Sequence, residues 1–361
     1  MFCYLADGCE QALPSCSINT NRYNDMADMR GLIEKFPEQI NATVTDLQKK
    51  DGSLHKEASS GFIPNGVLIL GMGGSGIGGA IASDILSCES EIPIVASSDY
   101  LIPGWISSSS LVLACSYSGN TEETIEAVNS AHERGATIAV ITSGGMLGEL
   151  AEKHNWPLVS MPGGQPPRSQ FGRSFIGLAW TLKQFGCFSE KMYSELEATS
   201  KSTAAAFKSV SEQAESIADL VQGKSIFLYS DTGVGSIATR WRQQLNENSK
   251  LLVNTQMFPE MNHNELVGWD SGKESDVAVI IRTPEDHTRT HFRMNVCSEI
   301  FREFGADVVV IDAEGEDQMQ RLMYLIQLGD ILSLLLAERA DIDPVDITNI
   351  ERLKAELNTL K

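Results

Sequence analysis

The chain repeats one strand–turn–helix pattern, and this repeat limits its fold more than any other feature. Residues 65–86 read NGVLILGMGGSGIGGAIASDIL, and residues 224–245 read KSIFLYSDTGVGSIATRWRQQL. Further along each copy, a helix-to-strand junction reads HERGATIAVI in the first half and REFGADVVVI in the second. Short apolar strands that alternate with amphipathic helices form parallel sheets covered by helices on both faces. We therefore expect an α/β fold with two tandem, doubly wound parallel-sheet domains.

The repeat predicts where the domains begin and end. Residues 1–21 have no clear period and form an N-terminal extension for which we expect disorder, and residues 22–55 form a helical segment. The first α/β domain is expected over residues 56–200 and the second over residues 201–361, with a C-terminal helix at its end. A long helical stretch over residues 190–221 connects them. The total of 361 residues is enough for two domains of ordinary size.

The composition is globular and argues against two kinds of partner. With 48 acidic and 28 basic residues the formal net charge is −20, and no basic stripe offers a nucleic-acid surface. No apolar run reaches the length of a membrane span, and the N-terminus lacks the basic start and apolar core of a signal peptide. Seven cysteines without a C-x-x-C pair indicate reduced thiols, so we expect a cytoplasmic protein. The cysteines are Cys3, Cys9, Cys16, Cys88, Cys115, Cys187 and Cys297, of which the first three leave a metal or redox role open.

The first glycine turn, GMGGSGIGG, is a candidate phosphate site. Glycine lets backbone N–H groups approach an anion, and the N-terminus of the following helix adds partial positive charge. The turn also contains a G-x-G-x-x-G pattern through Gly71, Gly73 and Gly76, and Asp99 follows the next strand, where a ribose-binding acid could lie. This stretch alone is compatible with three interpretations: it binds a dinucleotide, it binds a smaller phosphate compound, or it is a tight turn that binds no ligand.

A second loop, CSYSGNTEET at residues 115–124, favours the smaller phosphate. It begins at the end of a strand beside the first glycine turn, where open α/β folds bind ligands. Its hydroxyls and those of the glycine turn suit a terminal phosphate better than a pyrophosphate, although each could instead cap a helix. The second copy reads RTPEDHTRT at the matching place, so we expect it to have lost the anion site. The candidate phosphate-binding residues are Gly73, Gly74, Ser75, Ser116, Ser118 and Thr121.

These two loops together resemble a sugar isomerase (SIS) domain, and the duplication resembles the phosphoglucose isomerase superfamily. Four further segments narrow the resemblance to the bifunctional phosphoglucose/phosphomannose isomerases of archaea and some bacteria, over residues 22–361. They are FPEQ at 36–39, GGQPPRSQFG at 163–172, FPEMNHNELVGW at 258–269 and DIDPVDITNIERLKAEL at 341–357.

The resemblance implies an activity and four catalytic residues. It implies the interconversion of glucose 6-phosphate, and of mannose 6-phosphate, with fructose 6-phosphate through a cis-enediolate, with no cofactor and no metal. Glu247 would move the proton between C2 and C1, and Arg168 would face the enediolate oxygen. His263 would open the sugar ring from the partner subunit of a homodimer, and Lys354 would reach the ring-opening region. The other histidines, His55, His132, His154, His287 and His291, are expected to be surface or structural residues.

The sequence departs from the family pattern at two places. An extra proline, Pro167, precedes Arg168, which makes Arg173 a competitor for the enediolate role. The family often has Thr-Pro where Val345 and Asp346 stand here, so the threonine proposed to accommodate either C2 epimer has no secure match, although Thr348 is near. The glucose activity is therefore the firmer expectation.

Two other classes of protein remain as alternatives. A nicotinamide-dependent dehydrogenase would use the G-x-G-x-x-G turn and Asp99 to bind a dinucleotide. A non-catalytic sugar-phosphate sensor would have an SIS domain without catalytic residues, and it would be expected to carry a basic DNA-binding segment. The acidic chain has no such segment, and a sensor would have no use for Glu247, His263 and Arg168, so the isomerase is preferred.

Overall fold

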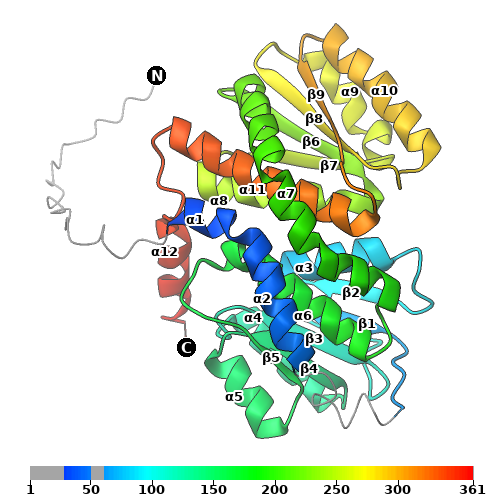
Figure 1. Ribbon diagram of the computed structural model, residues 1–361, viewed down its shortest axis with the longest axis vertical. Coiled ribbons are helices and arrows are strands. Elements are labelled where there is room, and N and C mark those ends of the chain that lie inside the picture. Colours follow the sequence, from blue (N-terminus) through cyan, green and yellow to red (C-terminus); the bar gives the residue numbers. More distant parts are fainter. Residues whose placement is uncertain (1–27, 50–60, 361) are drawn as a thin grey trace, which may run out of the picture.

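The protein contains two parallel β-sheets, each covered by helices. A computed structural model describes residues 28–49 and 61–360. The first sheet has five strands in the order β2-β1-β3-β4-β5, and the second has four in the order β7-β6-β8-β9. Figure 1 shows the second sheet above the first, with the long helices α7 and α11 crossing on the near side. The expected α/β class and its two parallel sheets are confirmed.

The first half contains the N-terminal helices and the five-stranded sheet. The two N-terminal helices are α1 (Met29–Glu34) and α2 (Phe36–Lys49). The strands are β1 (Val67–Leu70), β2 (Ile94–Ser97), β3 (Leu111–Ser116), β4 (Thr137–Thr142) and β5 (Leu158–Ser160). The helices are α3 (Gly73–Leu86), α4 (Glu122–Glu133), α5 (Gly145–His154), the 3₁₀ helix η3 (Pro167–Gln170), α6 (Phe171–Gln184) and α7 (Glu190–Val221).

The second half repeats this order with one strand fewer. The strands are β6 (Ser225–Asp231), β7 (Asn254–Phe258), β8 (Asp276–Arg282) and β9 (Asp307–Asp312). The α-helices are α8 (Gly235–Ser249), α9 (Glu265–Gly268), α10 (Thr288–Glu303), α11 (Gln318–Arg339) and α12 (Thr348–Leu357). Short 3₁₀ helices are η4 (Thr232–Val234), η5 (Glu260–His263) and η6 (Trp269–Ser271).

One hydrophobic core joins the two halves. The largest cluster of buried apolar side chains includes Val67 and Ile69 of β1 together with Ile226 and Leu228 of β6. Smaller clusters lie on the other side of each sheet. Because burial of apolar area is the main favourable term in folding, the shared core holds the two sheets in a fixed relation. That relation matters here because the candidate site draws residues from both halves.

Three features differ from the sequence-based expectations. The first is α3, expected to follow the glycine turn GMGGSGIGG. It begins inside that turn at Gly73, so these glycines form its first turn and not a loop before it. The second is β7, a mostly exposed edge strand whose polar residues hid it from a search for apolar runs. The third is α11, which is long and apolar enough to cross a membrane by length and composition. Its apolar window is 89% buried inside the fold, as expected of a core helix.

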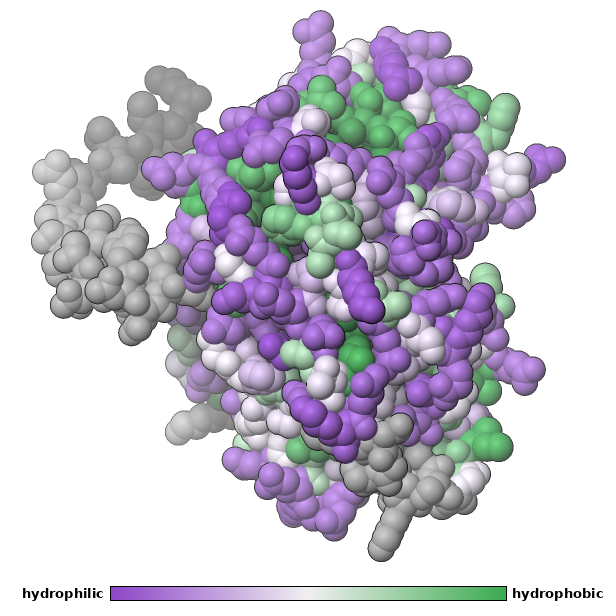
Figure 2. Space-filling model, in the orientation of Figure 1, coloured by the Kyte–Doolittle hydropathy of each residue, from purple (hydrophilic) through white to green (hydrophobic). Residues whose placement is uncertain are grey.

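Some expectations concern residues outside the part that the structure describes. They include the N-terminal extension at 1–21, the three early cysteines Cys3, Cys9 and Cys16, and His55. On the described part, polar side chains cover most of the face shown in Figure 2, as the large net negative charge suggests. Domain boundaries at 55/56 and 200/201 stay a prediction.

Candidate active site

The two loops expected to bind phosphate lie next to each other at one edge of the first sheet. Strands β1 and β3 are parallel neighbours, with Leu70 opposite Ala114, so the loops that follow them leave the sheet together. The Ser75 hydroxyl accepts a hydrogen bond of 2.9 Å from the Tyr117 backbone N–H, which ties one loop to the other. This edge lies at the point where the strand order reverses, the usual ligand site of an open α/β sheet.

The helices that begin at these loops have uncapped N-termini. Neither Met72, before α3, nor Thr121, before α4, caps its helix with a side-chain hydrogen bond. The Thr121 hydroxyl instead lies 2.8 Å from the Ser116 hydroxyl, which also accepts a bond from Gly119 N–H. The first N–H groups of a helix have no partner within it, so these two ends can bind an anion. Of the other predicted residues, Gly73 and Ser118 are exposed.

The glycine turn packs directly on the backbone of Arg168. A Cβ at Gly74 would lie 2.9 Å from the Arg168 nitrogen and 3.0 Å from its Cα, closer than side chains approach. The glycine therefore allows α3 and η3 to touch. A group bound at the glycine turn would lie next to the segment that carries Arg168.

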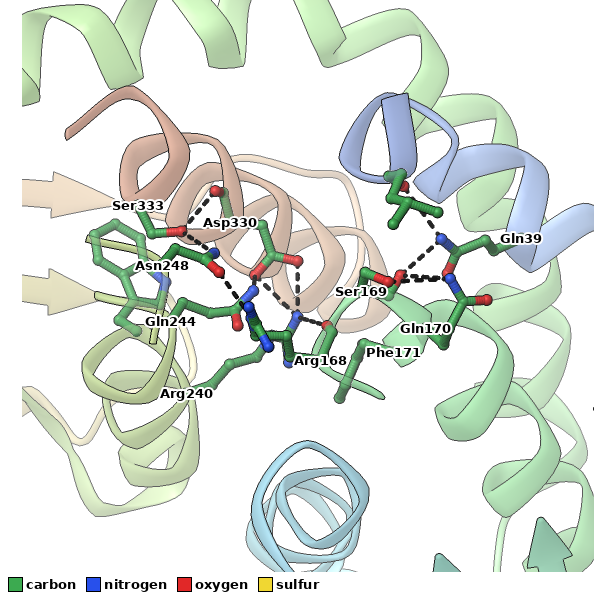
Figure 3. Close-up of polar contacts among 12 residues, drawn as sticks. Gln39, Arg168, Ser169, Gln170, Phe171, Arg240, Gln244, Asn248, Asp330 and Ser333 are labelled. Atoms are coloured by element: carbon green, nitrogen blue, oxygen red, sulfur yellow. Dashed lines mark hydrogen bonds and ion pairs between the residues drawn. The ribbon is translucent and has the colours of Figure 1, made fainter. Parts of the chain in front are cut away.

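Arg168 and Glu247 form an ion pair across the two halves of the chain. Nη1 of Arg168 donates to Oε2 of Glu247 at 3.0 Å, and the exposed fractions of the two side chains are 4% and 26%. Nε of Arg168 donates to Oδ1 of Asn248 at 2.7 Å (Figure 3). Burial lowers the pKa of Arg168, while the charges of Glu247 and Asp343 oppose that shift. An arginine stays protonated in proteins, so the site holds a fixed cation beside a carboxylate.

Hydrogen bonds from Arg168 and Lys250 attach the loop before α12 to this site. Nη2 of Arg168 donates to the backbone oxygen of Pro344. Lys250, the residue after α8, donates from Nζ to the backbone oxygens of Glu247 at 2.6 Å, Asp343 at 3.1 Å and Asp346 at 2.8 Å. Burial lowers the pKa of Lys250. Sequence reasoning missed Asn248 and Lys250, since only their distant partners reveal a role.

The other two residues implied to be catalytic lie apart from this pair. His263 is exposed at the end of η5, next to the edge strand β7, and Lys354 is exposed on α12. Within the described residues, neither shares a hydrogen bond or ion pair with Arg168 or Glu247. Four further histidines have structural contacts, which agrees with their expected role. His154 stacks on the Trp156 ring and His132 meets that ring edge-on. His287 accepts from Arg289 N–H, and His291 bonds to the Thr283 carbonyl.

The departures from the family pattern have local structural consequences. Arg173 lies on α6 and, in the described part of the chain, is not bonded to Glu247, whereas Arg168 is. Asp346 accepts bonds from the N–H and hydroxyl of Thr348, at 2.9 and 2.6 Å, and so orders the start of α12. These bonds lower the pKa of Asp346. Val345 packs against the main core.

In the second copy, a carboxylate of the chain itself occupies the helix end that corresponds to the anion site. Oδ2 of Asp84, from α3, accepts from the Ser236 N–H at 2.8 Å and from its hydroxyl, at the N-terminus of α8. Burial raises the pKa of Asp84, and the two bonds from Ser236 oppose the shift. Since this end of α8 already has an anionic partner, the geometry agrees with the expected loss of the second site.

Comparisons with known proteins identify relatives of most of the chain. Residues 210–357 match the family model of the bacterial phospho-glucose isomerase C-terminal SIS domain. A bifunctional phosphoglucose/phosphomannose isomerase of Caldicellulosiruptor bescii is 35% identical over 306 residues, which cover 82% of this chain and 90% of that protein. One from Aquifex aeolicus is 34% identical over 295 residues, covering 81% and 90%.

A solved structure supports the fold independently of sequence. The C-terminal domain of glucosamine-fructose-6-phosphate aminotransferase from Francisella tularensis superimposes with a TM-score of 0.70 at 15% identity, covering 88% of this chain and 98% of that one. At this identity the likeness concerns the fold alone. The sequence identity to the two isomerases, which extends over more than four fifths of this chain, shows that the chain belongs to the bifunctional phosphoglucose/phosphomannose isomerase family.

Proposed function

We propose that the protein interconverts glucose 6-phosphate, and mannose 6-phosphate, with fructose 6-phosphate, without a redox cofactor or a metal. The observation that carries this proposal is the contact between Arg168 and Glu247, beside a glycine turn packed on the Arg168 backbone. Family membership supports it. The site provides an anion-binding loop, a carboxylate and a buried cation, which are the groups that an aldose–ketose isomerisation uses. We place the enzyme in the cytoplasm.

In the proposed reaction the phosphate is held by the loops after β1 and β3. Glu247 removes the proton at C2 of the open-chain aldose; the C–H electron pair forms the C1=C2 bond, and the carbonyl electrons move to O1. Arg168 stabilises this enediolate, because a fixed buried cation is strongest where charge develops. The C2 hydroxyl proton then passes to O1, the O2 electrons form the C2 ketone, and the electrons of the C1=C2 bond take the proton back from Glu247 at C1.

Ring opening is assigned to His263 and Lys354, with His263 coming from the partner subunit of a homodimer. Its exposed position is consistent with a role in another subunit's site. Three large apolar side chains in this region, Leu252, Met257 and Val267, are also exposed, with exposed fractions of 94%, 38% and 72%. An apolar surface beside an open sheet edge is typical of a protein–protein interface.

Mixing two inactive variants tests the shared site. We expect Glu247→Gln and His263→Ala homodimers each to be nearly inactive, because each lacks one group at both sites. In a mixed dimer one site has both changes and the other has neither. Random reassembly of equal amounts after mild denaturation should therefore restore about a quarter of wild-type activity. If the mixture stayed as inactive as its components while size measurements showed exchanged subunits, His263 would act within its own chain.

A coupled assay tests the proposed activity itself. Purified protein would receive glucose 6-phosphate or mannose 6-phosphate, with and without a chelator, and fructose 6-phosphate formation would be followed. We expect turnover of both sugars, unaffected by the chelator. Turnover of glucose 6-phosphate alone would contradict the mannose activity and point to Val345 and Asp346 as the cause. Turnover of neither sugar would contradict the proposed function.

The packing of Gly74 predicts a second kinetic result. We expect Gly74→Ala to raise the KM for glucose 6-phosphate about tenfold or more, because the new Cβ must push the phosphate loop away from Arg168. Gly104→Ala is the matched control, since a Cβ there meets nothing within 4 Å. Steady-state kinetics and thermal melting of both variants would check this. A Gly74→Ala enzyme with wild-type KM would show that the loop does not hold the phosphate.

A further inference from the structure

Arg168 is held by a set of buried polar groups that extends well beyond Glu247. Its Nε donates to Asn248, the residue next to Glu247 on α8. Asn248 in turn donates from Nδ2 to the hydroxyl of Ser333, on α11, at 2.9 Å. Both Asn248 and Ser333 are fully buried. Figure 3 shows this chain of bonds running from η3 through α8 to α11.

The bonds in this chain have a fixed direction. The Ser333 hydroxyl donates its proton to the Asp330 backbone oxygen at 2.8 Å, so toward Asn248 it can only accept. The amide nitrogen of Asn248 must therefore face Ser333, and the amide oxygen must face Arg168. An arginine has five donors and no acceptor, so an oxygen in this position is what Nε requires. Ser333 thus sets the orientation of Asn248.

The backbone of Arg168 is also held by residues of α8 and α11. Its carbonyl oxygen accepts from Nη2 of Arg240 at 3.3 Å, and Arg240 pairs with Asp330 through the same nitrogen at 2.7 and 2.9 Å. Arg168 is therefore fixed at its carbonyl and at one edge of its guanidinium. With Nε bonded to Asn248, the second protons on Nη1 and Nη2 are the remaining donors for a substrate oxygen.

We propose that Asn248 and Ser333 are positioning residues that hold the Arg168 guanidinium in its transition-state orientation. This inference rests on the proposed function, in which Arg168 stabilises the enediolate. A long arginine side chain has many rotamers, and a misplacement of about 1 Å can lower a rate about a hundredfold. Asn248 removes that freedom at Nε without adding charge, so the positive charge stays available to the enediolate. Both residues are fully buried, so neither is open to a substrate.

The test compares two buried serine-to-alanine variants, of which only one loses a hydrogen bond to the Asn248 side chain. Ser333→Ala removes the acceptor that orients Asn248. Ser249→Ala removes another fully buried hydroxyl, which donates from α8 to the Ser333 backbone oxygen and not to Asn248 or Arg168. We expect Ser333→Ala to lower kcat about tenfold with KM for glucose 6-phosphate within about twofold, and Ser249→Ala to keep wild-type kcat. Asn248→Leu should lower kcat further, and Asn248→Gln should not restore it.

Binding measurements separate positioning from general loss of structure. The probe is the hydroxamate of 5-phosphoarabinonic acid, whose planar O–N–C–O group copies the enediolate, with inorganic phosphate as reference. For Ser333→Ala we expect hydroxamate affinity to fall by the same factor as kcat, while phosphate affinity and melting temperature match those of Ser249→Ala. Equal kcat values for the two serine variants would overturn the inference, whereas an inactive wild type would overturn the proposed function instead.

Discussion

Glu247→Gln is expected to lower kcat about a thousandfold while the protein stays folded. General base catalysis contributes about 10²–10⁴-fold, and an amide cannot take the C2 proton. Glutamine has the size of glutamate, and its oxygen can still accept from Nη1 of Arg168. The measurement is steady-state kinetics together with exchange of the C2 hydrogen of glucose 6-phosphate with solvent. The wild type should catalyse this exchange, and the variant should lose exchange and turnover together.

Another ion-paired glutamate provides the control for this prediction. Glu190 pairs with Lys183 at 3.1 Å, and its side chain is 79% exposed. Glu190→Gln removes the same charge and should leave kcat unchanged, because the exposed Glu190 side chain pairs with Lys183 and not with Arg168. If Glu247→Gln kept more than about a tenth of wild-type kcat, another group would have to be the base.

Most of the fold follows from periodicity, because strands and helices here are bounded by local signals. The predicted long helix at 190–221 coincides with α7, whose Ser189 caps the N-terminus by accepting from Met192 N–H. Buried strands such as β3 are visible as apolar runs. Periodicity fails where a tertiary contact decides the outcome. The glycines at the start of α3 disfavour a helix, yet they form its first turn where it packs on Arg168.

The candidate site is predictable in its loops and much less so in its long-range contacts. Ser116 ends β3 and Ser75 follows β1, two strands that pair in the sheet, so local reasoning reaches both hydroxyls. Arg168 and Glu247 lie 79 residues apart in sequence, and within the sequence only the family resemblance connects them. Asn248 and Ser333 have no motif at all. Their proposed role comes from the buried hydrogen bonds that they make, which depend on tertiary packing and cannot be read from the spacing of residues in the sequence.

Arg240→Met is expected to destabilise the protein by about 3–5 kcal/mol at pH 8, because it leaves the buried Asp330 carboxylate without its cation. Arg240 and Asp330 are bonded at 2.7 Å, with exposed side-chain fractions of 2% and 8%. The Arg240 guanidinium also lies over the Phe171 ring at 4.4 Å, and a methionine side chain can still pack on that ring. Denaturant unfolding of both proteins measures the difference. Arg282→Met, which breaks the more exposed pair with Asp312, should cost less than about 1 kcal/mol.

The loss of stability caused by Arg240→Met should become smaller as the pH falls. Burial raises the pKa of Asp330, and the ion pair with Arg240 opposes that shift, so removing Arg240 raises the pKa further. A carboxyl whose folded pKa exceeds its unfolded value stabilises the fold while protonated and loses that contribution as pH rises through the folded pKa. The deficit should therefore shrink between pH 8 and pH 5. Combining Arg240→Met with Asp330→Leu should recover most of the lost stability at pH 8, because no buried charge remains. If the loss of stability were independent of pH and persisted in the double variant, altered packing and not the unpaired charge would explain it.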